Sequence, residues 1–305
     1  MPGAMNTFLN VGLNDDITEK LSKMDNYAWT SWDCYRRLIQ TWGMSYGLER
    51  DQFDQIIIDY KKKYSVNQKV EFAPHVMREI AFEYKKLLAK YSIEFEEEPF
   101  AQLKKAIISV LNSWDTVRAQ AYRKHMHIAD EWGTAVTIQK MVLGNIHIES
   151  GSGVLFTKDV QEQGDEINLT GDFTFISQGE DIVGGLVKTL PISEKQRVKG
   201  VYSSPISLES TYPEIYQRLL EICTKMLEEG KMAHQEIEFT FETSRGEDLY
   251  ILQTRNMTFH YQSRMEVFDT PEEKMERVGS GIGIGSQALN GVIVFELQDI
   301  DWIKK

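Results

Sequence analysis

The sequence predicts an α+β protein, in which a helical subdomain is followed by a mainly antiparallel sheet with flanking helices. Two patterns in the sequence support this prediction. Apolar residues recur at steps of three and four over about residues 16–130, which is typical of amphipathic helices. At Gly133 the period changes to two, which is typical of strands, and strict alternation returns on both sides of a polar turn at residues 244–248.

The first fifteen residues are rich in Gly, Asn and apolar residues, and we expect an ordered loop with a short strand there. Asp15 and Asp16 can cap the helix that follows. An acidic run at residues 94–99, ending in Pro99, predicts a break within the helical subdomain. We interpret the aromatic positions as core stripes of the helices. These positions include Tyr27, Trp29, Trp32, Tyr35, Trp42, Phe53, Tyr60, Phe82, Tyr84, Trp114 and Tyr122.

Beyond Gly133 the strand prediction covers residues 134–142, 153–157 and 167–175. A helix is expected over residues 214–229, ending at Gly230. The chain then reads as a β-hairpin, whose strands cover residues 236–241 and 250–255.

The hairpin carries the candidate site. Side chains two apart on a strand share a face, so Glu236 and Glu238 point the same way, as do Gln253 and Arg255. If the strands pair with these faces matched, two carboxylates, an amide oxygen and a guanidinium converge. Oxygen ligands suit Mg²⁺ and a guanidinium suits a phosphate, which together are what a nucleoside triphosphate requires. An amphipathic hairpin whose polar face is only solvated produces the same alternation, so the hairpin by itself does not distinguish a binding site from a solvated surface.

The composition of the chain limits the classes of function that it can have. The chain has 305 residues, with 42% hydrophobic and 26% charged residues, which is ordinary for a globular protein. A net charge of −12 argues against a nucleic-acid binder, but not against binding of one nucleotide. Two distant cysteines and six histidines form no zinc or disulfide pattern, and this cysteine usage fits a protein of the reducing cytoplasm. There is no apolar run long enough for a membrane span and no signal peptide at the N-terminus, so no membrane partner is expected.

Three glycine-containing stretches are candidate phosphate or ribose contacts. Residues 149–154, set between two predicted strands, are expected to form a loop whose backbone N–H groups turn towards an anion, and a tight hairpin is the alternative. Residues 178–185 combine acidic residues with glycines and could accept from ribose hydroxyls, although a solvated turn is the competing interpretation. Residues 279–285 fit no dinucleotide fingerprint, and no P-loop motif occurs.

The order of these pieces along the chain resembles the nucleotide-binding region of the pyruvate phosphate dikinase and phosphoenolpyruvate synthase family, over nearly the whole length. The matching motifs lie at residues 1–7, 10–15, 35–40, 133–136, 141–145, 150–157, 178–183, 236–240 and 252–256.

This resemblance implies an ATP-grasp-like fold, in which two subdomains clamp ATP as the substrate. It implies that Glu236 and Glu238 hold Mg²⁺ with Gln253 beside them, and that Arg255 stabilises the transferring phosphoryl group, with Glu238 as a second catalytic residue. The remaining nucleotide contacts that it implies are Gly3, Gly151 and Gly153 at the phosphates, Glu180 at the ribose, and Gln139, Met141 and Val142 along the adenine as a hinge strand.

The resemblance also implies a division of the chain. Residues 1–15 would be the opening loop of the nucleotide site, residues 16–130 the helical subdomain and residues 131–258 the nucleotide-binding subdomain. A helical linker at 259–278 and the start of a swivelling phosphohistidine-type domain at 279–305 would follow. In the family, phosphoryl groups of ATP pass to a histidine on that domain and then to pyruvate.

Several departures from the family's pattern bear on activity. The sequence would lack the preceding portion that supplies a lysine and an arginine to ATP, the phosphohistidine segment and the barrel. Glu236 and Asn6 each stand where Asp is usual, and Ser152 replaces Thr. We therefore expect either the ATP-binding part of a dikinase-type phosphotransferase, completed by a partner subunit or domain, or an inactive piece. A non-catalytic regulatory or interaction module that keeps the fold is the alternative.

Overall fold

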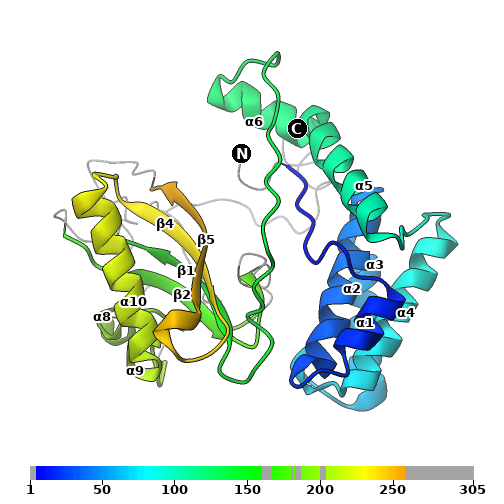
Figure 1. Cartoon of the computed structure of the whole chain (residues 1–305), viewed down its shortest axis with the longest axis horizontal. Coiled ribbons are helices and arrows are strands. Elements are labelled where there is room, and N and C mark those ends of the chain that lie inside the picture. The colour runs from blue at the N-terminus through cyan, green and yellow to red at the C-terminus, as the bar shows by residue number, and fades with distance from the viewer. Residues whose placement is uncertain (1–4, 160–165, 180–181, 183–186, 200–203, 258–305) are drawn as a thin grey trace, which may run out of the picture. The chain divides into compact units, whose positions relative to one another are not determined.

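The computed structural model describes residues 5–159, 166–179, 182, 187–199 and 204–257, and these form an α+β fold (Figure 1). The residues up to Met257 belong to one compact unit. Within the described residues, no helix is long and apolar enough to cross a membrane. The predicted linker and swivelling-domain start at 259–305 lie outside the described residues, and the predicted subdomain boundaries stay predictions.

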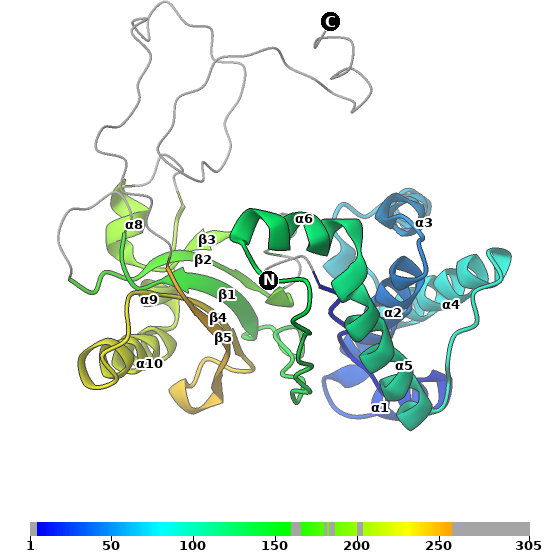
Figure 2. The same ribbon diagram turned by 90° about the horizontal axis from the view of Figure 1, so that it is seen from above.

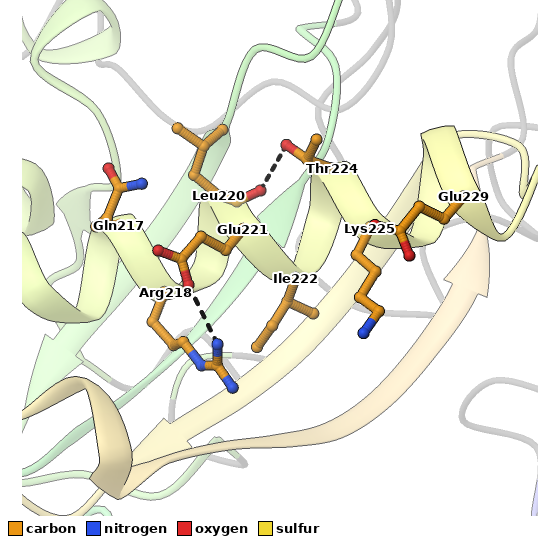
Figure 3. Close-up of a pocket in the computed structure, with 8 residues that line it drawn as sticks. All are labelled: Gln217, Arg218, Leu220, Glu221, Ile222, Thr224, Lys225 and Glu229. Atoms are coloured by element: carbon orange, nitrogen blue, oxygen red, sulfur yellow. Dashed lines mark hydrogen bonds and ion pairs between the residues drawn. The ribbon is translucent and has the colours of Figure 1, made fainter.

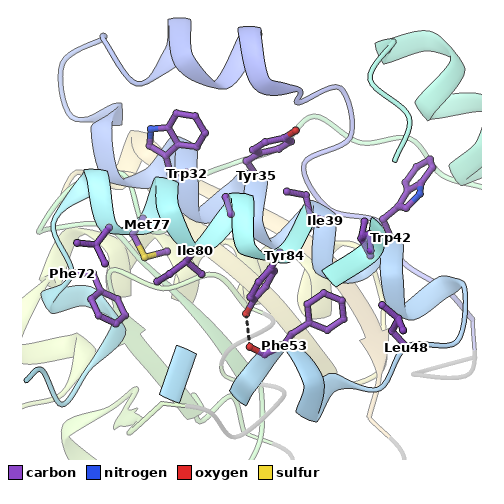
Figure 4. Close-up of a cluster of buried hydrophobic side chains, with 13 residues drawn as sticks. Trp32, Tyr35, Ile39, Trp42, Leu48, Phe53, Phe72, Met77, Ile80 and Tyr84 are labelled. Carbon is purple, nitrogen blue, oxygen red and sulfur yellow. Dashed lines mark hydrogen bonds between the residues drawn. The ribbon is translucent and has the colours of Figure 1, made fainter. Parts of the chain in front are cut away.

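The first part of the fold is helical, as predicted. Its longest helix, α2 (Tyr27–Ser45), packs along α4 (Pro74–Lys90), and the two helices enclose an aromatic core (Figure 4). In that core Tyr84 is fully buried and donates its hydroxyl to the backbone oxygen of Phe53 at 3.1 Å. Each large apolar side chain buried there contributes roughly 1.5–3 kcal/mol. The helices are α1 (Asp15–Leu21), α2 (Tyr27–Ser45), α3 (Arg50–Tyr64), α4 (Pro74–Lys90), α5 (Pro99–Asn112) and α6 (Val117–Met126).

The opening loop and the predicted break are fixed by side chains. Asn14, and not the predicted Asp15 or Asp16, caps α1 by accepting from the backbone N–H of Ile17. Residues 5–14 contain no strand, so the expected short strand is wrong over the part that is described. The fully buried Gln102 of α5 binds this loop, accepting from Gly12 N at 2.5 Å.

The break at residues 94–99 is confirmed, because α4 ends at Lys90 and α5 begins at Pro99. Glu98 caps α5 with its carboxylate, which accepts from the first free backbone N–H groups of the helix.

The second part is a five-stranded antiparallel sheet, with strand order β3-β2-β1-β4-β5 (Figure 2). Its strands are β1 (Gly151–Phe156), β2 (Thr170–Phe175), β3 (Leu190–Pro191), β4 (Gln235–Phe241) and β5 (Leu249–Asn256). The predicted hairpin is confirmed as β4 and β5. The predicted strands at 153–157 and 167–175 are confirmed as β1 and β2, with shifted ends.

Helix α10 (Pro213–Thr224) covers one face of the sheet. Its residues Ile215, Leu219 and Cys223 are buried against strand residues such as Phe173 and Phe239. A short π-helix, residues Lys225–Glu229, extends α10 to Gly230, which confirms the predicted helix and its end. The short helices α8 (Glu194–Lys199) and α9 (Leu208–Thr211) precede it.

The predicted strand at residues 134–142 is wrong. The segment is irregular throughout, and none of its residues joins the sheet. It borders β5 through one side-chain bond, in which Gln139 Nε2 donates to the backbone oxygen of Leu252 at 3.4 Å. Alternating apolar residues form a strand only where an edge pairs with their backbone, and this run makes no such ladder.

Candidate functional site

Four polar side chains converge on the face of the sheet opposite to α10. Glu236 pairs with Arg255 across β4 and β5, and Glu238 pairs with Gln253. Directly opposed residues of an antiparallel pair point to the same side, so all four share one face. The guanidinium of Arg255 lies 2.7 Å from Glu238 Oε1 and 3.8 Å from Glu236 Oε1. Each of the three charged side chains is about 30% exposed, so water and ligands can reach them.

Gln253 completes this cluster. With its amide oxygen turned towards Arg255, that oxygen accepts from Nη2 at 2.7 Å and from Nε at 3.1 Å. The arrangement gives the guanidinium three oxygen partners that hold it on the exposed face. We call Glu236, Glu238, Gln253 and Arg255 the hairpin cluster.

A β-bulge at Leu252 produces this matched facing. Ile251 pairs with Phe239 on the α10 side, and the register then shifts, so that Gln253 pairs with Glu238 on the opposite side. Strict alternation from Tyr250 to Arg255 was therefore a wrong expectation. Without the extra residue, Ile251 and Arg255 would face the same way. The bulge lets Ile251 join the core while Arg255 faces the carboxylates.

Two further polar residues, Thr240 and Asp172, lie on this face and were not among the predicted site residues. Thr240 continues the row of Glu236 and Glu238 along β4, and its hydroxyl lies 2.8 Å from that of Ser152 on β1. Asp172 of β2 also faces this side, and burial raises the pKa of its carboxyl, while a 2.8 Å bond from the Thr189 hydroxyl opposes that shift. Thr240 lies inside the predicted strand at 236–241, so the alternation that places Glu236 and Glu238 on one face places Thr240 there as well.

Gly151 and Gly153 lie inside β1, so the loop expected at residues 149–154 is wrong for these two positions. β1 is paired on both edges, and the ladders to β2 and β4 use its backbone groups. Both glycines face the α10 side, where a Cβ on Gly153 would overlap the ring of Phe239 and one on Gly151 would lie 2.6 Å from the ring of Phe241. Close packing of two aromatic rings accounts for these glycines.

The expected adenine contacts lie on the segment beside β5. Gln139, Met141 and Val142 precede Leu143, whose backbone N–H donates to Glu242 Oε1 at 3.2 Å, just past the end of β4. The segment therefore runs next to the hairpin, although it is not the hinge strand that was expected. Gly3 and Glu180 lie outside the described residues.

The donor set of the hairpin cluster fits Mg²⁺. This ion is usually bound through one or two carboxylates, with water and substrate phosphates as its remaining ligands. Glu236 and Glu238 supply two carboxylates, and the amide oxygen of Gln253 lies beside them. Among the described residues, no group of three or more His, Cys, Asp or Glu side chains could hold a metal by itself. The cluster therefore suits a metal that arrives with a phosphate.

A surface depression of about 490 Å³ lies elsewhere, along α10 (Figure 3). It is lined by Gln217, Leu220 and Lys225 among others, and Arg218 forms a 3.1 Å ion pair with Glu221 at its rim. The depression is on the helix that covers the opposite side of the sheet, so it is separate from the hairpin cluster.

Comparison with known proteins points to one family. Its sequence profile is described as "Pyruvate phosphate dikinase, AMP/ATP-binding domain" and matches residues 1–214. The chain is 35% identical over 256 residues to the pyruvate, phosphate dikinase of Rickettsia typhi and 37% identical over 259 residues to that of Rhizobium meliloti. It is 34% identical over 258 residues to the chloroplastic pyruvate, phosphate dikinase of Mesembryanthemum crystallinum. These matches cover 84% of this chain but only 28%, 28% and 25% of the respective relatives.

Proposed function

Since this chain belongs to the pyruvate phosphate dikinase AMP/ATP-binding domain family, we propose that it is the ATP-binding part of a dikinase-type phosphotransferase. In this proposal it binds Mg-ATP on the exposed face of an ATP-grasp-like sheet. A phosphoryl group of ATP is then transferred to a histidine on a partner domain or subunit, and from there to a small acceptor such as pyruvate. The convergence of the hairpin cluster on one accessible face is the observation that supports this function most strongly.

The proposed roles follow from charge and reach. Glu236 and Glu238 hold the magnesium ion, with Gln253 as a neutral oxygen ligand beside them. A magnesium ion held there would supply positive charge that neutralises the phosphates. Arg255, which is ion-paired with Glu238 at 2.7 Å, would bind a phosphate oxygen through its guanidinium if Glu238 held the metal. Phosphoryl transfer depends mainly on such positioning and charge neutralisation.

A partner is part of this proposal. The chain spans only about a quarter of the length of the relatives that it matches, and its net charge of −12 opposes binding of a polyanion. Further cations contributed by another domain or subunit would lower that electrostatic cost. The histidine that accepts the phosphoryl group is assigned to the same partner.

Label transfer from radioactive ATP tests the proposed function. In a complex of the chain with its partner, we expect label to appear as acid-labile phosphohistidine. Glu238→Ala and Arg255→Ala should each reduce the rate at least about 100-fold, as removal of a group that stabilises transition-state charge does.

The hairpin offers matched controls at its tip. Arg245 and Glu247 form an exposed 2.9 Å ion pair there, beyond three register pairs of the hairpin from the cluster, so Arg245→Ala and Glu247→Gln should leave the rate within about twofold. Full transfer by the doubly substituted Glu238→Ala, Arg255→Ala protein would refute the catalytic assignment.

A further inference from the structure

Helix α2 is buried on two sides with opposite chemistry. One side carries Trp32, Tyr35, Ile39 and Trp42, which belong to the aromatic core of the helical part. The other side carries a polar stripe at the spacing of a helical face, and each of its members is at most 4% exposed. We call these four residues the polar stripe: Thr30, Asp33, Cys34 and Arg37.

The polar stripe binds two segments that flank strands of the sheet. Thr30 Oγ1 donates to the backbone oxygen of Asn145 at 2.5 Å, and Asn145 Nδ2 donates to Asp33 Oδ2 at 3.1 Å. Gln178 Nε2 donates to Cys34 Sγ at 3.2 Å and to Asn145 Oδ1 at 3.4 Å. Asn145 lies shortly before β1 and Gln178 just after β2, so the stripe ties the helical part to the sheet.

Asp33 is ionised in this setting. Its burial would raise the pKa of the carboxyl, but Arg37, Lys69 and Arg36 lie against it and hold the pKa well below the usual range. Arg36 Nη2 and Arg37 Nε each lie 2.9 Å from it, and Lys69 Nζ lies 3.1 Å away. A buried carboxylate with such partners is held in one geometry, since losing a partner would strand a buried charge.

Hydrogen bonds continue from these segments to Thr240 on β4, the strand that carries Glu236 and Glu238. The backbone N–H of Ser177 donates to Gly144 O at 2.9 Å, and Ser152 Oγ donates to Ser177 O at 2.9 Å. Ser152 in turn contacts the buried Thr240, which lies on the same face of β4 as Glu238, two residues further along the strand. The other end of the Asn145 segment is bound to the sheet by the bond from Leu143 to Glu242.

We propose that the polar stripe, through Asn145, positions the segment at residues 139–145 and the Ser152–Thr240 contact for nucleotide binding, with Thr30 and Asp33 as positioning residues. The nucleotide part of this proposal rests on the proposed function. The mechanical part, that the stripe holds these segments against β1 and β4, stands on the contacts alone.

Amide hydrogen exchange in the nucleotide-free protein tests the mechanical part. The reporters are the amides of Leu143 and Ser177, and the amides of α4 serve as the internal reference. Thr30→Val keeps the side-chain shape and removes the bond to Asn145, so the reporters should exchange about tenfold faster while α4 is unchanged. Asn145→Leu keeps the bond from Thr30 to the backbone oxygen but removes the two side-chain bonds with Asp33 and Gln178, and it should have a larger effect.

Helix α2 supplies both controls. Ser31 is equally buried beside Thr30, but its hydroxyl bonds within the helix to Tyr27 O at 2.7 Å, so Ser31→Ala should leave the reporters unchanged. Thr30→Ser keeps the hydroxyl and should restore slow exchange. Unchanged reporters in a folded Thr30→Val protein, or equal acceleration in α4, would overturn the proposal.

Titration with Mg-ATP tests the nucleotide part. The dissociation constant should rise about five- to tenfold for Thr30→Val, but not for Thr30→Ser or Ser31→Ala. Faster reporters with unchanged affinity would overturn the positioning role. If the unsubstituted protein binds no Mg-ATP even in complex with its partner, the proposed function fails, and the exchange result still decides whether the stripe holds the segments.

Discussion

Arg255 is the residue whose neighbours define the site. Its guanidinium is shared between two carboxylates and an amide on an accessible face, at an edge strand of the sheet. A pair exposed to this extent contributes at most about 1 kcal/mol to stability, so stability alone does not explain the grouping of these charges. A ligand that replaces one partner of the guanidinium explains it better.

Glu194, at the start of α8, gives a test of the local electrostatics. Hydrogen bonds from Ser207, Arg197 and Ser210 lower the pKa of its carboxyl to about 2, from an ordinary value of 4.5. Because the folded-state pKa is depressed, the stabilisation is present above pH 4.5 and is lost as the pH falls towards 2. Ser207→Ala should move the midpoint of Glu194 upwards in an NMR titration.

Ser204 provides the comparison for that titration. Its hydroxyl donates to the backbone oxygen of Ile206 at 2.6 Å, and its replacement by alanine should leave the Glu194 midpoint in place. A Glu194 midpoint near 4.5 in the unsubstituted protein would contradict this account of the charge.

At the scale of elements, β1 is shaped by the rings packed on it. Gly153→Ala would bring a Cβ into the ring of Phe239 and within 2.9 Å of Asp172 O. We expect a loss of about 1–3 kcal/mol in the free energy of unfolding, measured by chemical denaturation. Gly133→Ala, where nothing lies within 4 Å of the added Cβ, should change it by less than about 0.5 kcal/mol.

Phe239→Leu distinguishes packing from phosphate contact at Gly153. Trimming the ring should recover part of the stability lost in Gly153→Ala, because the two residues share one space. Additive losses in the double variant would argue against the packing explanation.

The hairpin was predictable because its signal is local. Glu236 and Glu238 face the same way by strand geometry alone, and the polar turn sets where the strands meet. The bulge at Leu252 was not predictable from alternation, since it depends on contacts on both faces of β5. Ile251 packs against the core on one face, and Arg255 lies opposite Glu236 on the other face.

The irregular segment at 134–142 and the glycines of β1 were not predictable, because their structure depends on residues that are distant in the sequence. The segment alternates like a strand, but whether an alternating run joins a sheet depends on a partner edge that the local sequence does not reveal. Gly151 and Gly153 look like a loop until the rings of Phe239 and Phe241 are placed against them.

At the scale of the whole molecule, the order of helical and sheet parts followed from the change of period, but their connection did not. Asp33 and Asn145 are far apart in the sequence, and a stripe of polar residues on a buried helix has no local sign of its partner. The junction combines buried ions with neutral amides, and among the described residues Gln178 Oε1 lies there without a hydrogen-bond partner.

Every role proposed for the hairpin cluster requires that its face binds a metal–nucleotide complex. NMR of the chain titrated with Mn-ATP to millimolar concentration tests it directly, because the paramagnetic ion broadens the signals of nearby nuclei. We expect broadening to centre on Glu236, Glu238, Gln253 and Arg255, and to be lost in the doubly substituted Glu236→Gln, Glu238→Gln protein. Broadening centred on the α10 depression, or none at millimolar Mn-ATP, would contradict it.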